Sequence, residues 1–104
     1  MTTLETSEAD GQIFTGNVQL VHAVGMHARP AVKLTKLAKK FQAQIFVRVT
    51  GAAEWINAKS VAKIMAMRAA HGSMIEIKAS GSDAEAAVAA LVDLVATDFP
   101  DRAS

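Results

Sequence analysis

A single histidine, His27, stands in a short segment whose residue types suit phosphate chemistry. The segment reads GMHARP and spans residues 25–30. Imidazole changes its charge near neutral pH, so much of it is unprotonated and nucleophilic there. A ring nitrogen can therefore attack a phosphoryl phosphorus and form a labile covalent N–P bond. The histidine thus predicts an acceptor that takes up a phosphoryl group and hands it on.

The neighbours of His27 predict a cradle for phosphate oxygens. Pro30 suits the first turn of a helix, because its missing N–H would have no partner there. This places His27 at or just before the helix start, with the amides of Ala28 and Arg29 directed toward it. Such amides bind phosphate, and the Arg29 guanidinium adds charged donors. Gly25 permits a sharp turn before the histidine. Binding of a free anion without covalent chemistry stays open as an alternative.

The elements that must position this segment follow from the spacing of apolar residues. Spacings of two predict four strands, at residues 15–21, 45–50, 53–58 and 74–80. Spacings of three and four predict three helices, at residues 28–41, 60–70 and from 82 onward. The order is therefore β-α-β-β-α-β-α. Since each helix carries one apolar stripe, the helices should cover one face of the sheet.

Local signals predict where the later helices begin and end. Gly72 should end the second helix, because glycine tolerates positive φ. The sequence SDAE at residues 82–85 resembles a capping box and should open the third helix. We expect a loose extension at residues 1–14, one domain at 15–99 and a frayed tail at 100–104.

Length and composition bound the class of protein. With 104 residues, of which 51% are hydrophobic and 20% charged, the chain has material for one globular core. It has no cysteine, which excludes disulfides and suits the cytosol. No apolar run approaches the ~20 residues of a membrane helix, and residues 1–11 do not resemble a secretory signal. His22 lies near His27 but has no convincing third partner for a metal site. We expect a cytoplasmic monomer without metal, cofactor or membrane contact.

Charge is distributed unevenly along the chain. Between His22 and Ser73 there are nine Lys or Arg residues and one acid, whereas from Glu76 onward there are six acids and two bases. The net charge of +1 argues against a general nucleic-acid binder. The distribution favours a basic face that attracts acidic or phosphate-bearing partners. A solvated surface with mixed charge is the alternative.

Two motifs resemble those of a known family. The sequence GMHARPA at residues 25–31 is similar to the active-site motif of the HPr family, the phosphocarriers of the bacterial phosphotransferase system. The sequence NAKSV at residues 57–61 resembles the family's second motif, and the similarity runs from about Gly16 to Phe99. The resemblance implies an α+β open-faced β-sandwich, with a four-stranded antiparallel sheet and three helices on one face.

The same resemblance implies roles for individual residues. His27 would be phosphorylated on Nδ1 by Enzyme I, itself charged from phosphoenolpyruvate, and would pass the group to an EIIA-type protein. Arg29 would stabilise the phosphate. Ser60 matches the regulatory serine that an HPr kinase/phosphorylase modifies in some bacteria, although a serine at a helix start also serves as an N-cap. The protein would be a carrier with a phosphohistidine intermediate and no turnover of a small substrate of its own.

The family places its second helix against its docking partners. The residues expected to contact such partners are Lys33, Lys36, Lys59, Val61, Lys63, Ile64, Met65 and Arg68. The basic members of this set should flank His27 and meet an acidic surface. Val24, Met26 and Arg68 depart from many sugar-transport members and lean toward the nitrogen-related branch, often called NPr.

Two rival functions belong to other classes. In the first, the protein is a regulatory interaction module, and phosphorylation of His27 or Ser60 controls which partner it binds. In the second, it is an RNA-binding α/β domain, since β-α-β-β-α-β orders recur there. Such domains stack bases on exposed aromatic residues. The strands here offer chiefly Phe46 and Trp55, so we expect no nucleic-acid partner.

Overall fold

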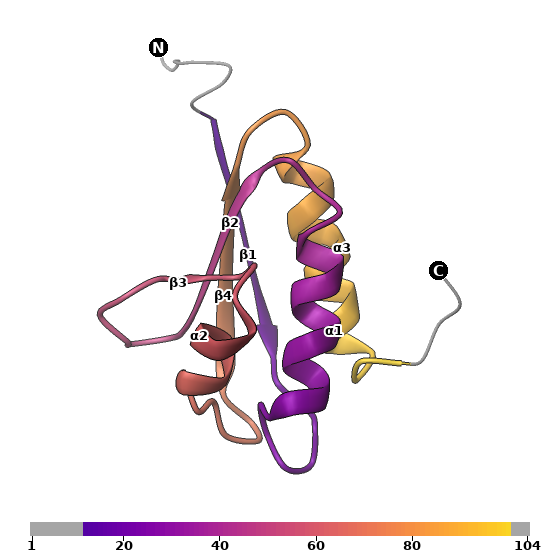
Figure 1. Ribbon diagram of the computed structural model, residues 1–104. Coiled ribbons are helices and arrows are strands. Elements are labelled where there is room, and N and C mark those ends of the chain that lie inside the picture. The colour runs from indigo at the N-terminus through magenta and orange to yellow at the C-terminus, as the bar shows by residue number, and fades with distance from the viewer. Residues whose placement is uncertain (1–11, 101–104) are drawn as a thin grey trace.

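The computed structural model describes residues 12–100 and shows a four-stranded antiparallel sheet with three helices on one face (Figure 1). The predicted fold class and element order are confirmed. The elements are β1 Ile13–Gln19, α1 Ala28–Ala38, β2 Gln44–Val49, β3 Ile56–Asn57, α2 Val61–Ala66, β4 Met74–Ser80 and α3 Ala84–Ala96.

Alternation along the central strand explains why the helices lie on one side. The strand order is β1-β4-β2-β3, so β4 pairs with both β1 and β2. Ile75 and Ile77 of β4 are fully buried beneath the helices, whereas Glu76 and Lys78 lie on the other face. Successive side chains of a strand point to opposite faces, so this sequence gives the sheet one apolar face and one polar face.

One core fills the space between the sheet and the helices. Each element except the two-residue β3 supplies side chains to it, and burial of each large one stabilises the fold by about 1.5–3 kcal/mol. Its largest fully buried aliphatic members are Leu20, Leu34, Ile45, Val47, Ile64, Ile75, Ile77, Leu91 and Val95. Figure 1 shows α1 and α3 side by side over the sheet, with α2 near the start of α1.

The open face of the sheet carries aromatic rings that the protein's own cations already cover. The Arg48 guanidinium lies 4.4 Å from the centre of the Trp55 ring, and Lys78 Nζ lies 4.3 Å from it. Arg48 Nε also donates to Glu76 Oε1 at 2.8 Å. Stacking of nucleic-acid bases on Trp55 would have to displace these cation–π contacts. The arrangement suits a packing role for this ring.

Several element boundaries differ from those predicted. The first strand begins at Ile13, inside the extension expected at residues 1–14; residues 1–11 and 101–104 lie outside the described part. The third strand has two residues instead of six, because only Ile56 and Asn57 pair with β2. The second helix ends at Ala66, and Arg68, with φ of 53°, turns the chain out of helical geometry before Gly72.

The predicted capping box at residues 82–85 is wrong. Asp83 is the N-cap of α3, and its side chain makes no cap hydrogen bond to that helix. Its carboxylate instead accepts hydrogen bonds from the backbone N–H groups of Gln42 and Ala43, at 2.9 and 2.8 Å. Asp83 therefore ties the start of α3 to the loop between α1 and β2.

We expect Asp83→Asn to destabilise the protein in a pH-dependent way. The hydrogen bond from the amide of Gln42, followed by that from Ala43, holds the pKa of the Asp83 carboxyl below its ordinary value. Because the folded-state pKa is lowered, the stabilisation is present above about pH 4 and is lost as the pH falls through the folded-state pKa. Urea unfolding at pH 7 and at about pH 3 should show a difference between wild type and variant that shrinks in acid.

The control for this experiment is Glu85→Gln, which removes a negative charge from the first turn of the same helix. An Asp83→Asn penalty that stays constant over this pH range would show that the ionised carboxylate is not the source of the stabilisation.

Candidate functional site

The loop that carries His27 is held by the loop between α2 and β4. The amide of Gly72 donates to the carbonyl of Leu20 at 2.7 Å, and the amide of Leu20 donates to Ser73 at 2.8 Å. Further along, the amide of Met26 donates to the carbonyl of Ala69 at 2.8 Å. These backbone bonds fix the chain on both sides of the turn that leads into α1.

Gly25 is required at this turn by its conformation and by its neighbour. It has φ of +74°, and its amide donates to the carbonyl of His22 at 2.9 Å. A Cβ at this position would lie 2.6 Å from the carbonyl oxygen of Ala69, the same oxygen that binds the amide of Met26. The predicted sharp turn is confirmed, and close approach of two backbone segments adds a second reason for glycine.

His27 is the N-cap residue of α1, in extended backbone conformation with φ of −140° and ψ of −166°. The amide of Ala31 donates to its carbonyl at 2.9 Å, whereas its imidazole makes no cap hydrogen bond to the helix. Ala28 and Arg29 take the first two helical positions, where N–H groups point to the helix start. Pro30 is third and brings no N–H. The predicted helix start is confirmed, with the half-buried imidazole beside it.

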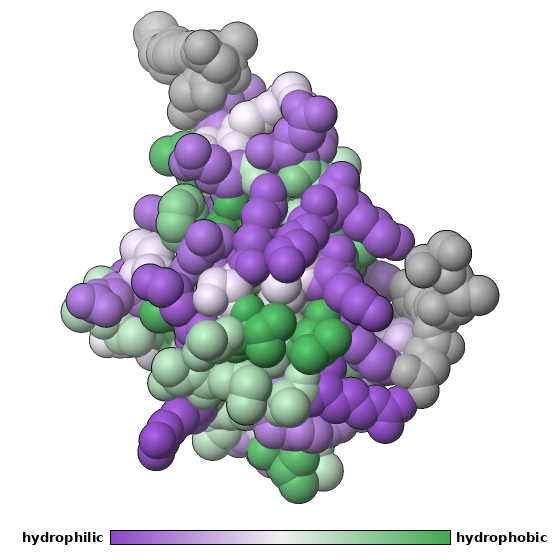
Figure 2. Space-filling view, in the orientation of Figure 1, coloured by the Kyte–Doolittle hydropathy of each residue, from purple (hydrophilic) through white to green (hydrophobic). Residues whose placement is uncertain are grey.

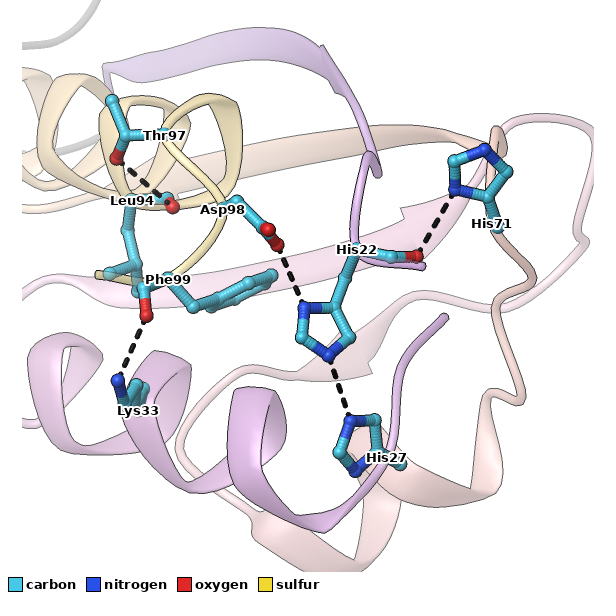
Figure 3. A network of polar contacts seen from close by, with 8 residues as sticks. All are labelled: His22, His27, Lys33, His71, Leu94, Thr97, Asp98 and Phe99. Carbon is cyan, nitrogen blue, oxygen red and sulfur yellow. Dashed lines mark hydrogen bonds and ion pairs between the residues drawn. The ribbon is translucent and has the colours of Figure 1, made fainter. Parts of the chain in front are cut away.

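The imidazole of His27 is the end of a chain of three side chains (Figure 3). Its Nε2 lies 3.0 Å from Nε2 of His22, and the ring centres are 5.0 Å apart. Nδ1 of His22 lies 2.8 Å from Oδ1 of Asp98. The second nitrogen of His27, Nδ1, lies on the side of the ring away from His22 and takes no part in this chain of contacts.

Asp98 was not found by sequence reasoning, because it lies 76 residues from His22. It follows α3 in a tight turn, in which Asp98 and Phe99 have φ of 62° and 52°. The amide of Phe99 donates back to Leu94 at 2.9 Å, and Lys33 Nζ donates to the carbonyl of Phe99 at 2.8 Å. The Phe99 ring meets His22 edge to face. These contacts hold Asp98 against His22.

The basic residues expected at the site have different surroundings. Arg29 and Lys36 of α1 and Lys63 and Arg68 of the α2 region are exposed. Lys33 is half-buried and binds the Phe99 carbonyl, and Lys59 Nζ donates to the carbonyl of Phe41 at 2.8 Å. Lys33 and Lys59 therefore each link two segments of the fold through a hydrogen bond to a backbone carbonyl.

The second helix presents part of the expected docking set and hides one member of it. Ile64 is fully buried in the core, so its prediction as a partner-contacting residue is wrong. It lies on the face of α2 that packs inward. Met65 is 40% exposed and Val61 is half-buried. Figure 2 shows apolar side chains gathered over α2 and the first part of α1, bordered by hydrophilic ones.

Ser60 is the N-cap of α2. Its Oγ accepts a hydrogen bond from the amide of Lys63 at 3.3 Å, and its carbonyl accepts one from Ile64 at 3.0 Å. The residue is half-exposed. The capping role that the sequence suggested is therefore confirmed.

Residues 12–100 contain no group of three or more His, Cys, Asp or Glu side chains arranged to hold a metal ion. Within the same residues, no helix has the length and apolar character needed to cross a membrane.

Comparison with known proteins gives a consistent pattern. The family model described as the PTS HPr component phosphorylation site matches residues 14–97. The chain is 36% identical over 84 residues to the phosphocarrier protein NPr of Escherichia coli, covering 81% of this chain and 92% of that protein. It is 32% identical over 79 residues to phosphocarrier protein HPr of Neisseria meningitidis, covering 76% and 86%.

A longer relative matches over only part of its length. The chain is 38% identical over 78 residues to a multiphosphoryl transfer protein of Vibrio cholerae, which covers 74% of this chain but 20% of that protein.

Solved structures share the fold. HPr-C-His from Thermoanaerobacter tengcongensis superposes with a TM-score of 0.77 at 33% identity, covering 86% of this chain and 99% of that one. A phosphocarrier protein HPr from Bacillus anthracis gives a TM-score of 0.73 at 40% identity, covering 80% and 96%.

Proposed function

Because this chain belongs to the HPr family of phosphotransferase-system phosphocarriers, we propose that His27 is its phosphoryl acceptor. An Enzyme I-type protein, charged from phosphoenolpyruvate, supplies the group, and an EIIA-type protein receives it. The observation that carries this proposal is the half-buried imidazole at the start of α1, whose Nδ1 faces away from His22.

The transfer needs little from the protein beyond position and charge. The lone pair of His27 Nδ1 forms the new N–P bond in line with the N–P bond of the donor's phosphohistidine, which breaks. The leaving nitrogen keeps the electron pair. The reverse exchange with the next acceptor regenerates free His27, so the protein carries the group without consuming a substrate of its own.

The start of α1 supports the phosphorylated state. The amides of Ala28 and Arg29 and the positive end of the helix dipole favour an anion at this place. The exposed Arg29 guanidinium adds two parallel donors of the kind that hold phosphate oxygens. These contacts stabilise the phosphate moderately, which suits a carrier that must release the group.

The proposal is tested by incubating the protein with Enzyme I and phosphoenolpyruvate labelled in its phosphate. We expect one phosphoryl group per chain, labile in acid and stable in base, as an N–P bond requires. A wild-type protein that takes up no label would reject the proposal.

Docking to the donor should depend on salt. Lys36 of α1, Lys63 of α2 and Arg68, which follows α2, are all exposed. Charged surfaces of opposite sign speed association, and salt screens this attraction. We expect the association rate with Enzyme I to fall by about 10-fold or more between low and high salt. Stopped-flow fluorescence measures this rate.

Paired variants identify the surface that is responsible. Lys36→Gln combined with Lys63→Gln should slow association at low salt, whereas Lys78→Gln, on the opposite face of the sheet, should not. Equal rates at low and high salt would refute electrostatic steering.

We propose in addition that Ser60 is a regulatory acceptor for an HPr kinase/phosphorylase-type enzyme. This half-exposed residue is the N-cap of α2, the helix that also carries the exposed Met65. A phosphate there adds about two negative charges, which a helix start tolerates but an acidic docking partner repels. A Ser60→Asp variant that binds Enzyme I as tightly as wild type would contradict this role.

A further inference from the structure

Beyond the phosphoryl acceptor itself, we propose that His22 and Asp98 form a positioning pair that keeps the proton of His27 on Nε2 and leaves Nδ1 unprotonated for attack. This inference rests on the proposed function and specifies how the acceptor nitrogen is chosen. Neither residue belongs to the two motifs at 25–31 and 57–61. Figure 3 shows the three side chains in a row, from the end of α3 to the start of α1.

The direction of the hydrogen bonds follows from the carboxylate end. An ionised carboxylate only accepts hydrogen bonds, so Nδ1 of His22, 2.8 Å from Asp98 Oδ1, must be the donor. A neutral imidazole has one N–H, so Nε2 of His22 then carries a lone pair. That lone pair lies 3.0 Å from Nε2 of His27, which must therefore supply the proton. His27 is left with an unprotonated Nδ1.

The surroundings hold this pair in place from several sides. The carbonyl of His22 accepts a hydrogen bond from the amide of Gly25 at 2.9 Å. The edge-to-face contact with Phe99 limits rotation of the His22 ring. Lys33 ties the segment after α3 to α1 through the carbonyl of Phe99. His22 and Asp98 are 25% and 51% exposed, so no buried charge has to be formed to build the pair.

The pair has a defined role during transfer. When Nδ1 of His27 forms the N–P bond, the ring becomes positively charged because it still carries the Nε2 proton. His22 can share or accept that proton, and Asp98 then balances the charge on His22. On return of the phosphoryl group, the proton returns to Nε2 of His27. The arrangement follows the logic by which a carboxylate and a histidine orient a nucleophile.

Nitrogen-15 NMR of the histidine rings tests the proposal without any phosphoryl transfer. In wild type at about pH 8, where imidazoles are mostly neutral, we expect opposite tautomers in the two rings: Nδ1–H in His22 and Nε2–H in His27. His71→Gln assigns the third ring and should leave these signals unchanged. The same tautomer in both rings, or Nε2–H in His22, would overturn the inference.

Two variants of Asp98 separate the effect of its hydrogen bond to His22 from the effect of the backbone conformation at this position. Both Gly and Asn tolerate the left-handed backbone at this position. Asp98→Gly removes the acceptor and should release His22 into a mixture of tautomers. Asp98→Asn keeps an acceptor oxygen and should retain the Nδ1–H form. An unchanged His22 signal in Asp98→Gly would show that the carboxylate does not orient the ring.

Kinetics with Enzyme I give a second readout. His22→Phe keeps a ring against Phe99 but cannot accept a proton. We expect kcat for phosphoryl uptake to fall about 10- to 100-fold, whereas KM for Enzyme I should stay within about twofold of the wild-type value. His22→Gln supplies an acceptor oxygen and should recover part of the loss. If wild type is phosphorylated and His22→Phe transfers at the same rate, the positioning role fails while the carrier function stands. If wild type takes up no label, the carrier function fails while the NMR result is unaffected.

Discussion

Replacing His27 with alanine is expected to abolish acid-labile phosphorylation while the fold persists. The imidazole supplies the only nucleophile in the proposed transfer, and removal of a nucleophile lowers rates by about 10⁴-fold or more. The fold should tolerate the change, because the side chain makes no cap hydrogen bond to α1 and is only half-buried. Label uptake from phosphoenolpyruvate and Enzyme I measures the first effect, and urea unfolding measures the second.

His71→Ala is the matched control, since His71 is an exposed histidine close to the same loops. It should keep full label uptake. Label of the same stability on the His27→Ala variant would place the acceptor elsewhere and reject our assignment.

Replacing Gly25 with alanine is expected to lower the free energy of unfolding by about 2–4 kcal/mol. The left-handed backbone at φ of +74° costs a residue with a Cβ about 1 kcal/mol or more. The new Cβ would also meet the carbonyl oxygen of Ala69 at 2.6 Å, and relief of this overlap adds about 1–3 kcal/mol. Because that carbonyl anchors the amide of Met26, His27 should also shift relative to His22, and phosphoryl uptake should slow in the folded variant.

Gly51→Ala separates the two contributions to this loss. Gly51 has φ of +95°, but a Cβ there would meet nothing within 4 Å. It should therefore pay the backbone cost alone, about 1 kcal/mol. Urea denaturation of both variants at one temperature gives the comparison. Equal losses for the two glycines would show that the contact with Ala69 does not constrain the turn.

The turn and helix start at residues 25–30 and the order of elements were predictable because both depend on local rules. Apolar spacings of two or of three and four follow from strand and helix geometry, so they predicted seven elements in the correct order. The motif at residues 25–31 placed His27 at a helix start because Pro30 fits a first turn. Gly25 was identified for the same local reason.

Reasoning from neighbours in the sequence gave the wrong result where a side chain contacts a distant part of the chain. The SDAE sequence fits a capping box, yet Asp83 binds the amides of Gln42 and Ala43 from another loop. Ile64 was placed among the docking residues because the resemblance sets the whole second helix against partners, yet its side chain is buried in the core. In both cases packing against distant parts of the chain decided the outcome.

By itself, the sequence predicted which residue carries the proposed chemistry and determined the helix start beside it, since these depend on neighbours within a few positions. Only the tertiary structure decided which side chains contact the Nε2 side of the imidazole, namely His22 and, through it, Asp98. Asp98 reaches His22 because the turn after α3 folds back over the start of α1, a contact across 76 residues that no periodicity encodes. Its existence depends on how the three helices pack over the sheet, and that packing gives His27 its hydrogen-bonded partner.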